Sequence, residues 1–160
     1  MLKLKNVPEE LQAAIDEKGY DKLTSVQSLV LDPSNSGKDL LVSSQTGSGK
    51  TLAYGLSISC DGLEEIIDKD NKLKTLIVTP TRELALQVFN ELAWLFSKTS
   101  ITISTAIGGM DIKKERKNIV KGVDLLIGTP GRINDHIRRK TFDLNHLKSL
   151  VLDEADEMLD

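Results

Sequence analysis

The residues best suited to chemistry lie in one short stretch, Gln45-Thr46-Gly47-Ser48-Gly49-Lys50-Thr51. The apolar run from Asp39 to Ser43 before it is predicted to be a buried parallel strand, and Leu52 to Ile58 after it continues as a helix. This order forms a phosphate cradle, because glycines let the backbone curl around an anion with N–H groups pointing inward. The helix dipole favours the same negative charge. The stretch therefore predicts a nucleoside triphosphate site, for ATP or GTP.

Individual residues of this loop have expected roles. Lys50 would reach the β and γ phosphates, and the Thr51 hydroxyl would hold Mg²⁺. Ser44 stands at the first position of the pattern G-x-x-x-x-G-K-[ST], where glycine is usual, and is a mild departure because it is still small. The alternative is an ordinary glycine turn before a helix. The Lys-Thr pair and the preceding apolar run argue against it.

A second candidate group lies near the other end of the chain. The apolar run Leu147 to Leu152 is predicted to be a buried strand, and it ends in Asp153-Glu154-Ala155-Asp156. Carboxylates at the carboxyl end of such a strand lie on the edge where open α/β sheets bind ligands. Asp153 could hold the water shell of Mg²⁺, and Glu154 could orient or deprotonate an attacking water. Acidic clusters are often only solvated helix ends, but the preceding strand and the upstream phosphate loop favour the catalytic interpretation.

Together, the Asp-Glu-Ala-Asp sequence and the phosphate loop resemble the corresponding motifs of the DEAD-box ATP-dependent RNA helicases. Further motifs follow in the family's order: Gly19-Tyr20 and Gln27 resemble the Q motif, and Pro80-Thr81-Arg82-Glu83-Leu84-Ala85, Gly108-Gly109 and Thr129-Pro130-Gly131-Arg132 resemble its RNA-contact motifs. The resemblance spans residues 19 to 156. It implies a RecA-like P-loop NTPase fold of the α/β class, with a parallel sheet covered by helices on both faces.

The resemblance also implies functional roles. ATP and Mg²⁺ would be the cofactors, with nucleotide contacts from Tyr20, Gln27 and the loop from Ser44 to Thr51, and metal contacts from Thr51 and Asp153. RNA would be bound through its backbone, without sequence preference, by Pro80, Thr81, Arg82, Gly108, Gly109, Thr129, Pro130, Gly131 and Arg132. Asp156 would couple the nucleotide site to a second RecA-like domain.

The chain departs from the family pattern in two places. Leu23 and Ser25 stand where the Q motif usually has prolines, and Leu2 stands where an aromatic residue stacks on adenine. An aliphatic side chain loses the stacking contribution, worth about 0.5–1.5 kcal/mol between aromatic rings. We therefore expect adenine preference through Gln27 together with reduced nucleotide affinity.

The resemblance covers only part of a helicase. Residues 1–160 are expected to be an incomplete first RecA-like domain, and the second domain, with its arginine fingers and half of the RNA site, is not in this sequence. We expect the segment alone to hydrolyse ATP barely, and the full-length protein to unwind or remodel RNA. Two alternatives remain open: an RNA clamp ATPase without strong unwinding, and a catalytically silent truncated binding module.

Composition agrees with one compact domain. The chain has 160 residues, of which 39% are hydrophobic, a single cysteine and a net charge of −3. It has no run of about 18 apolar residues that could cross a membrane, and a single cysteine fits a reducing compartment, so a cytoplasmic location is predicted. The negative charge gives no general argument for nucleic acid, so the RNA prediction rests on local groups.

The periodicity of the chain predicts alternating elements. Helices are expected over 8–18, from 80 through 96, over 111–121 and over 132–140, and strands over 39–43, 75–79, 101–107, 123–128 and up to 153. The clusters Lys113-Lys114-Glu115-Arg116-Lys117 and Arg138-Arg139-Lys140 are interpreted as solvated surface. His136 and His146 lack metal-ligand neighbours in sequence and are expected at the surface. Trp94 is expected to pack.

Overall fold

The computed structural model describes residues 2–60, 66, 70 and 72–159. The chain forms two compact units. Residues 1–65 and 91–100 make the first, called here the phosphate-loop unit. Residues 66–90 and 101–160 make the second, called the sheet unit. The stretch from Asp61 to Lys74 mixes acids and lysines, which predicts a surface connection, and it lies largely outside the described residues. At its described end, Leu73 and Lys74 are buried.

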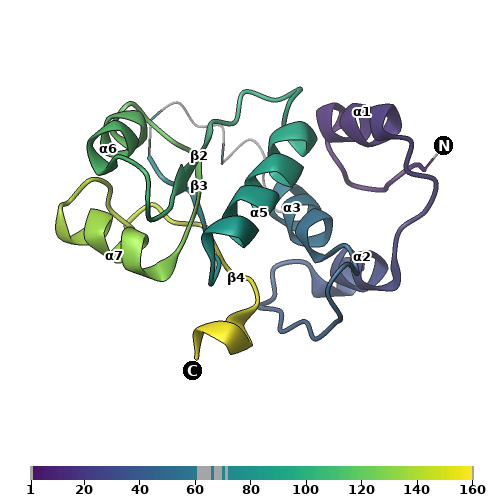
Figure 1. Cartoon of the computed structure of the whole chain (residues 1–160). Helices are drawn as coiled ribbons and strands as arrows, with labels where there is room; N and C mark the ends of the chain where they lie inside the picture. The colour runs from purple at the N-terminus through teal and green to yellow at the C-terminus, as the bar shows by residue number, and fades with distance from the viewer. Residues whose placement is uncertain (1, 61–65, 67–69, 71, 160) are drawn as a thin grey trace. The chain divides into compact units, whose positions relative to one another are not determined.

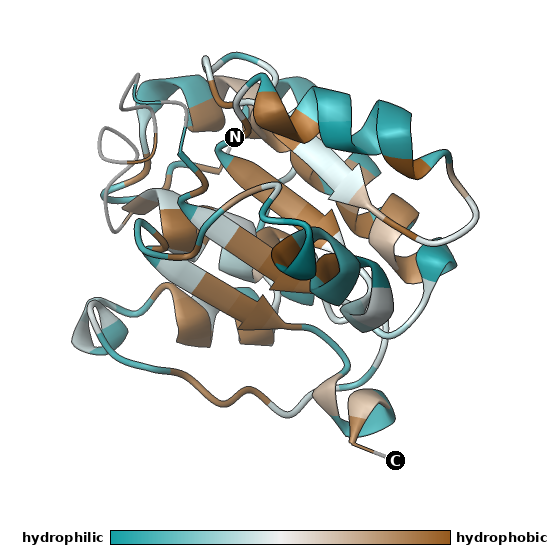
Figure 2. Ribbon diagram, turned by 90° about the vertical axis from the view of Figure 1, so that its left-hand side faces the viewer, coloured by the Kyte–Doolittle hydropathy of each residue, from teal (hydrophilic) through white to brown (hydrophobic). Residues whose placement is uncertain are grey.

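The sheet unit is built on four parallel strands (Figure 1). They are β1 (Thr75–Val78), β2 (Ile103–Ala106), β3 (Leu125–Gly128) and β4 (Ser149–Leu152), in the spatial order β2-β3-β1-β4. In Figure 2, β1, β3 and β4 are mostly hydrophobic in colour, whereas β2, which contains Ser104 and Thr105, is pale. The runs of Leu, Ile and Val in β1 and β3 are largely buried, as is typical of strands covered on both faces. In β4, Leu150 and Leu152 are 56% exposed, so the expectation that this last strand is buried is wrong. The predicted parallel α/β sheet is confirmed.

Helices cover both faces of this sheet. On one face, α6 (Ile112–Val120) and α7 (Pro130–Arg138) bring Ile119 and Ile133 into a buried cluster with residues of the three strands β1, β2 and β3. The other face carries Ile77 and Ile127, neither of which is exposed. The first part of α5 (Arg82–Leu95), which lies on that side in Figure 1, has Ala85 and Val88 fully buried.

The phosphate-loop unit is helical. It contains α1 (Glu9–Lys18), α2 (Ser25–Val30), a 3₁₀ turn (Pro33–Asn35), α3 (Lys50–Cys60) and the last residues of α5. A Cβ on Gly55 of α3 would lie 2.7 Å from Leu92 Cδ2 and 2.9 Å from Leu95 Cδ2. Glycine at this position therefore permits the close approach of α3 to the end of α5.

Two elements differ from the sequence-based expectation. Residues 39–43 form no strand, and Leu41 is fully exposed, so the strand predicted before the phosphate loop is wrong. The apolar pattern expresses only a preference, and a strand forms when a neighbouring strand supplies the partners for its backbone groups. The helix α2 was not predicted, although Thr24-x-x-Gln27 is a capping-box sequence that announces a helix start.

Candidate functional site

Thr79 and two predicted site residues, Thr129 and Asp153, continue the strand ladders at the carboxyl edge of the sheet. The N–H of Thr79 donates to the Gly128 carbonyl at 2.9 Å, and that of Thr129 donates to the Ala106 carbonyl at 3.0 Å. The N–H of Asp153 donates to the Val78 carbonyl at 2.9 Å. The segments that begin at residues 80, 108, 129 and 153 therefore leave the sheet at one edge, where open α/β sheets bind ligands.

The segment after β1 starts α5. The Thr81 hydroxyl oxygen accepts from the Leu84 N–H at 3.2 Å and so caps the helix. Pro80 is half-buried, whereas Thr81 and Arg82 are exposed. The Thr81 hydroxyl keeps its own proton for a further bond, which leaves it compatible with the phosphate contact predicted for it.

The guanidinium of Arg82 lies directly against Gly109, and it occupies the place where a side chain at residue 109 would begin. Gly109 has a φ of 79°, in the left-handed region that favours glycine. Gly108 has neither constraint, because its φ is not left-handed and a Cβ added there would meet no atom within 4 Å. The two glycines of the doublet therefore have different structural roles.

The segment after β3 starts α7. Pro130 occupies the first turn, where its missing N–H costs nothing, and Thr129 is the N-cap without a side-chain capping bond. The backbone N–H groups of the first turn, which includes Gly131, have no partners within the helix. This arrangement suits phosphate oxygens.

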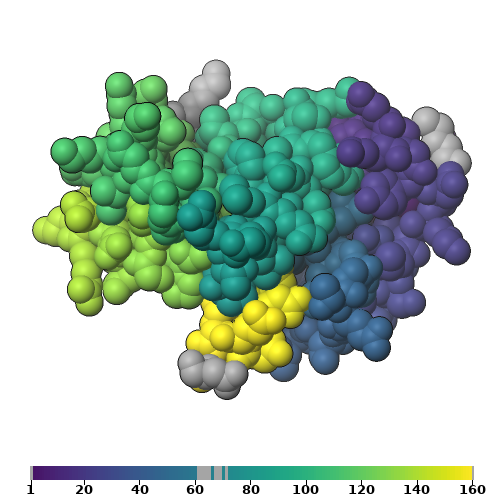
Figure 3. All heavy atoms as spheres, viewed as in Figure 1, coloured from purple at the N-terminus to yellow at the C-terminus, as the bar shows by residue number. Residues whose placement is uncertain are grey.

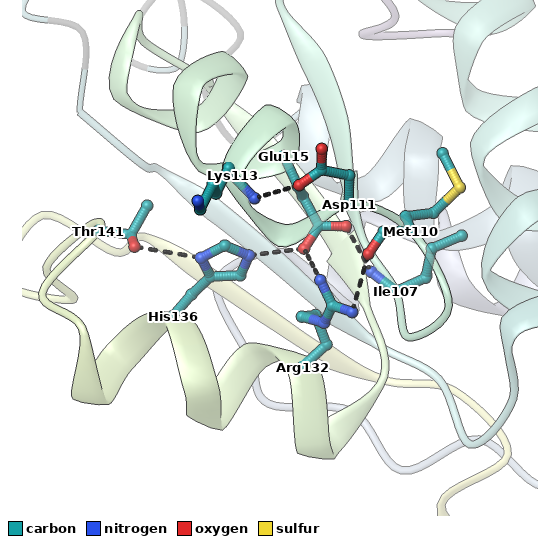
Figure 4. A network of polar contacts seen from close by, with 8 residues as sticks. All are labelled: Ile107, Met110, Asp111, Lys113, Glu115, Arg132, His136 and Thr141. Atoms are coloured by element: carbon teal, nitrogen blue, oxygen red, sulfur yellow. Dashed lines mark hydrogen bonds and ion pairs between the residues drawn. The ribbon is translucent and has the colours of Figure 1, made fainter.

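Arg132 is engaged inside the protein (Figure 4). Its Nη1 donates to Glu115 Oε1 at 3.3 Å, and its Nη2 donates to the Met110 carbonyl at 3.2 Å. Only 12% of its side chain is exposed. The structure therefore shows Arg132 tying α7 to the loop that carries Gly108-Gly109, and its predicted contact with RNA stays a prediction.

Two expectations about surface residues are wrong. His136 is fully buried, with Nε2 2.6 Å from Glu115 Oε1 and Nδ1 3.1 Å from Thr141 Oγ1. Glu115, which falls in a sequence cluster interpreted as solvated, is buried at 7% exposure. Its charged neighbours on α6, namely Lys113, Lys114, Arg116 and Lys117, are exposed as expected. Figure 3 shows the surfaces of α6 and α7 adjoining. The one local signal was helical spacing, because Glu115 lies three residues after Ile112 and four before Ile119, on the apolar face of the predicted helix.

The acidic segment after β4 turns sharply. Asp153 is buried at 6% exposure, and Glu154 has φ 49° and ψ 49° before the 3₁₀ turn η2 (Ala155–Met158). A left-handed conformation costs a residue other than glycine about 1–2 kcal/mol. Such strain is concentrated at functional sites. Asp156 in the turn is exposed.

The phosphate loop is held by its own polar groups. The Ser48 N–H donates to the Gln45 carbonyl at 3.3 Å, and Gly47 and Gly49 have φ of 79° and 83°. Lys50 Nζ donates to the Ser44 carbonyl at 3.1 Å, across the loop. Both glycines are therefore required by the backbone, and the Lys50 ammonium lies over the loop that is expected to hold phosphate.

The Q-motif helix is bonded to this loop. Gln27 Nε2 donates to the Gly49 carbonyl at 3.2 Å, while Gln27 Oε1 accepts from the Thr24 N–H at 2.9 Å. The Thr24 hydroxyl donates to the Ser48 carbonyl at 2.8 Å. Thr24 was missed from sequence, and the capping-box pattern could have found it. The Gln27 amide retains one N–H and one lone pair for an adenine edge, although the residue is only 2% exposed here.

Tyr20 lies in an aromatic pair. Its ring stacks on Trp94 at a centroid distance of 6.0 Å, and Lys18 Nζ lies 5.2 Å from the Trp94 ring centroid. Trp94 therefore packs as expected. Tyr20 is 39% exposed, and its predicted contact with nucleotide stays a prediction.

The donors expected for Mg²⁺ are oxygens, the Thr51 hydroxyl at the start of α3 and the Asp153 carboxylate after β4. Magnesium prefers such ligands, with only one or two carboxylates and the rest from phosphate and water. Within the part of the chain that the structure describes, no three His, Cys, Asp or Glu side chains form a metal-holding group. A hydroxyl and a carboxylate are each oxygen ligands of the kind that Mg²⁺ accepts beside nucleotide phosphates.

None of the described helices is long and apolar enough to span a membrane.

Comparison with known proteins adds the evolutionary context. The family model for DEAD/DEAH box helicases matches residues 24–160. The chain is 40% identical over 151 residues to the ATP-dependent RNA helicase CshA of Listeria monocytogenes, covering 94% of this chain and 28% of that protein. It is 43% identical over 156 residues to the ATP-dependent RNA helicase HAS1 of Chaetomium globosum, covering 97% of this chain and 26% of that one.

A solved structure has the same fold. The crystal structure of a hypothetical ATP-dependent RNA helicase from Sulfolobus tokodaii matches with a TM-score of 0.82 at 34% identity, over 94% of this chain and 42% of that one. The chain thus spans under half of the solved structure and under a third of the relatives named above.

Proposed function

Because the chain belongs to the DEAD/DEAH box helicase family, we propose that it is the nucleotide-binding part of an ATP-dependent RNA helicase. The observation that carries the proposal is the pairing of two motifs within one α/β chain. One is a glycine loop with Lys50 at the start of α3, and the other is Asp153-Glu154 at the end of β4. The relatives' names support ATP and RNA as the ligands.

In this proposal the chain's own groups divide the work on ATP. The loop from Ser44 to Thr51 binds the phosphates through N–H groups, Lys50 pairs with them as a positive charge, and Gln27 reads the adenine edge. Asp153 and Thr51 hold the metal, and Glu154 orients the attacking water. Bound Mg²⁺ would supply charge neutralisation on the phosphate oxygens.

RNA binding is proposed along the carboxyl edge of the sheet. Thr81 and Arg82, the glycine doublet, and the first turn of α7 supply hydroxyl, guanidinium and backbone N–H donors there. Donors of this kind grip phosphates and sugars without reading bases, so the affinity should be independent of sequence and fall steeply with salt. The greater length of the relatives supports a second RecA-like domain, to which Asp156 would couple. The cytoplasmic location stays a prediction.

The test is RNA-stimulated ATP hydrolysis by the full-length protein. Lys50→Ala and Glu154→Gln should each lower turnover by about 10²–10³-fold or more, because groups that stabilise phosphoryl transfer contribute at that scale. Lys38→Ala and Glu157→Gln are matched controls, since these exposed residues lie in the same units but outside the motifs. Turnover within about tenfold of the wild type in both test variants would remove Lys50 and Glu154 from these roles.

A further inference from the structure

Both flanks of the glycine doublet are held by one network of polar contacts, which is centred on the buried Glu115 (Figure 4). Before the doublet, the Ile107 N–H donates to Glu115 Oε2 at 3.0 Å. After it, the Met110 carbonyl accepts from Arg132 Nη2 at 3.2 Å. The two anchors are themselves joined, because Arg132 Nη1 donates to Glu115 Oε1 at 3.3 Å. Since glycines leave the backbone free to adopt many conformations, these anchors are what fix the doublet.

His136 completes the network from α7. A carboxylate oxygen only accepts, so with Glu115 ionised the His136 Nε2, which lies 2.6 Å from Glu115 Oε1, carries the proton. Thr141 Oγ1 lies 3.1 Å from Nδ1 on the other side of the ring. The fully buried imidazole therefore holds the carboxylate in one orientation, toward both Ile107 and Arg132.

The negative charge of Glu115 indicates how this residue can contribute to RNA binding. A carboxylate close to a phosphate-binding surface opposes the binding of a polyanion, and burying it is costly unless it is paired and hydrogen-bonded. Glu115 meets that condition with three partners and is only 7% exposed. Its contribution to RNA binding must therefore be geometric.

We propose that Glu115 is a positioning residue for RNA, because its buried carboxylate joins Ile107, Arg132 and His136 and so fixes the glycine doublet against the start of α7. This role rests on the RNA-binding function proposed above. Arg132 acts in it as a clamp on Met110, in addition to any contact of its own with RNA.

The decisive variant is Glu115→Gln in the full-length protein. Glutamine has one acceptor oxygen, so it cannot accept from Ile107 and also from Arg132 and His136. Binding of fluorescent single-stranded RNA, measured by anisotropy with a non-hydrolysable ATP analogue, should weaken at least tenfold. Electrostatics alone predicts the reverse, because the variant loses a negative charge. Binding as tight as that of the wild type, or tighter, would overturn the proposal.

Asp135→Asn is the matched control. It removes the same charge from an exposed position on α7, and RNA affinity should stay the same or rise slightly. A loss in this control equal to that of Glu115→Gln would overturn the proposal, because the effect would then not depend on the network.

A second variant covers a failure of Glu115→Gln to fold. Arg132→Lys keeps the charge, but one ammonium cannot reproduce the fork that reaches both Glu115 and Met110. We expect weaker RNA binding with the salt dependence of the wild type, and unchanged affinity would overturn the clamp role.

Amide hydrogen exchange over residues 107–111, measured without RNA, should be faster in both variants, whereas unchanged exchange would contradict the anchoring. A wild-type protein that fails to bind RNA overturns the proposed function and this role with it. Normal wild-type binding with an unaffected Glu115→Gln variant overturns this role alone.

Discussion

Replacing Gly109 by alanine tests the geometry of the glycine doublet most directly. Gly109 has a φ of 79°, and a left-handed conformation costs a residue with a Cβ about 1–2 kcal/mol. The new methyl group would also displace the Arg82 guanidinium, which can move because it ends a flexible side chain. Alanine stiffens the unfolded chain, which returns about 0.4–1 kcal/mol. The net expectation is a destabilisation of about 1 kcal/mol, or a drop of about 2–4 °C in Tm for a chain of this size.

Gly108→Ala is the matched control for this substitution. A Cβ at this position would have no atom within 4 Å, and its φ is not left-handed. Its stability should therefore be unchanged or raised by about 0.4–1 kcal/mol. Thermal unfolding of the two variants side by side gives the comparison, and equal melting temperatures would refute the assignment of the strained position to Gly109.

Gly109→Ala should also weaken RNA binding. If the alanine variant leaves the left-handed conformation, returning to it on binding RNA costs about 1–2 kcal/mol, which weakens affinity roughly 5–30-fold. Fluorescence anisotropy with single-stranded RNA measures this. Wild-type affinity in Gly109→Ala would show that RNA does not require the observed loop conformation.

Three further predictions concern the phosphate-loop unit. Gly49→Ala should weaken ATP binding, measured by calorimetry, more than Gly47→Ala does, because both have left-handed φ but only a Cβ at Gly49 would strike the Gln27 amide; equal losses would contradict this. Gln27→Ala should reduce the preference for ATP over GTP by about 1–3 kcal/mol, by analogy with amide–adenine pairs in DNA recognition, and a wild type that binds both equally would end the claim. The pKa of Glu17 lies below its ordinary 4.5 because Lys98 donates a hydrogen bond to it and adds a positive charge. The Glu17–Lys98 ion pair therefore stabilises the fold fully above the ordinary pKa of 4.5. This contribution is lost as the pH falls through the lowered pKa of Glu17 in the folded protein. Glu17→Gln should lower Tm slightly at neutral pH, since the pair is exposed, and its Tm should converge with that of the wild type in acid; a difference that persists there would exclude this pair as the cause.

Much of the architecture was predictable because it is encoded locally. Apolar runs of strand length, separated by helical periodicity, predicted the strands that became β1 to β4, and these pair in parallel. Once the strands are parallel, residues that follow them must emerge at one edge. This is why the positions of Pro80, Gly108, Thr129 and Asp153 at that edge could be predicted from their place in the sequence alone.

Features that depend on distant residues were not predictable in the same way. The run from Asp39 to Ser43 has a strand's composition, but a strand exists only where another segment pairs with it, and here Leu41 is fully exposed. The capping box at Thr24 was readable in principle. Its bond to the Ser48 carbonyl was not, because the two residues meet only in the folded chain.

Glu115 and His136 show most clearly which features depend on distant parts of the chain. In the sequence, Glu115 lies within a run of lysines and an arginine, and no residues with metal-ligand spacing lie near His136. Their burial results from the packing of α6 and α7 on the sheet, which brings together residues 21 positions apart in the sequence. The sequence alone predicted that the motifs following β1, β2, β3 and β4 emerge at one edge of the sheet. Which charged side chains become buried depends on the folded chain, because the cost of burying a charge is offset by partners that distant segments supply.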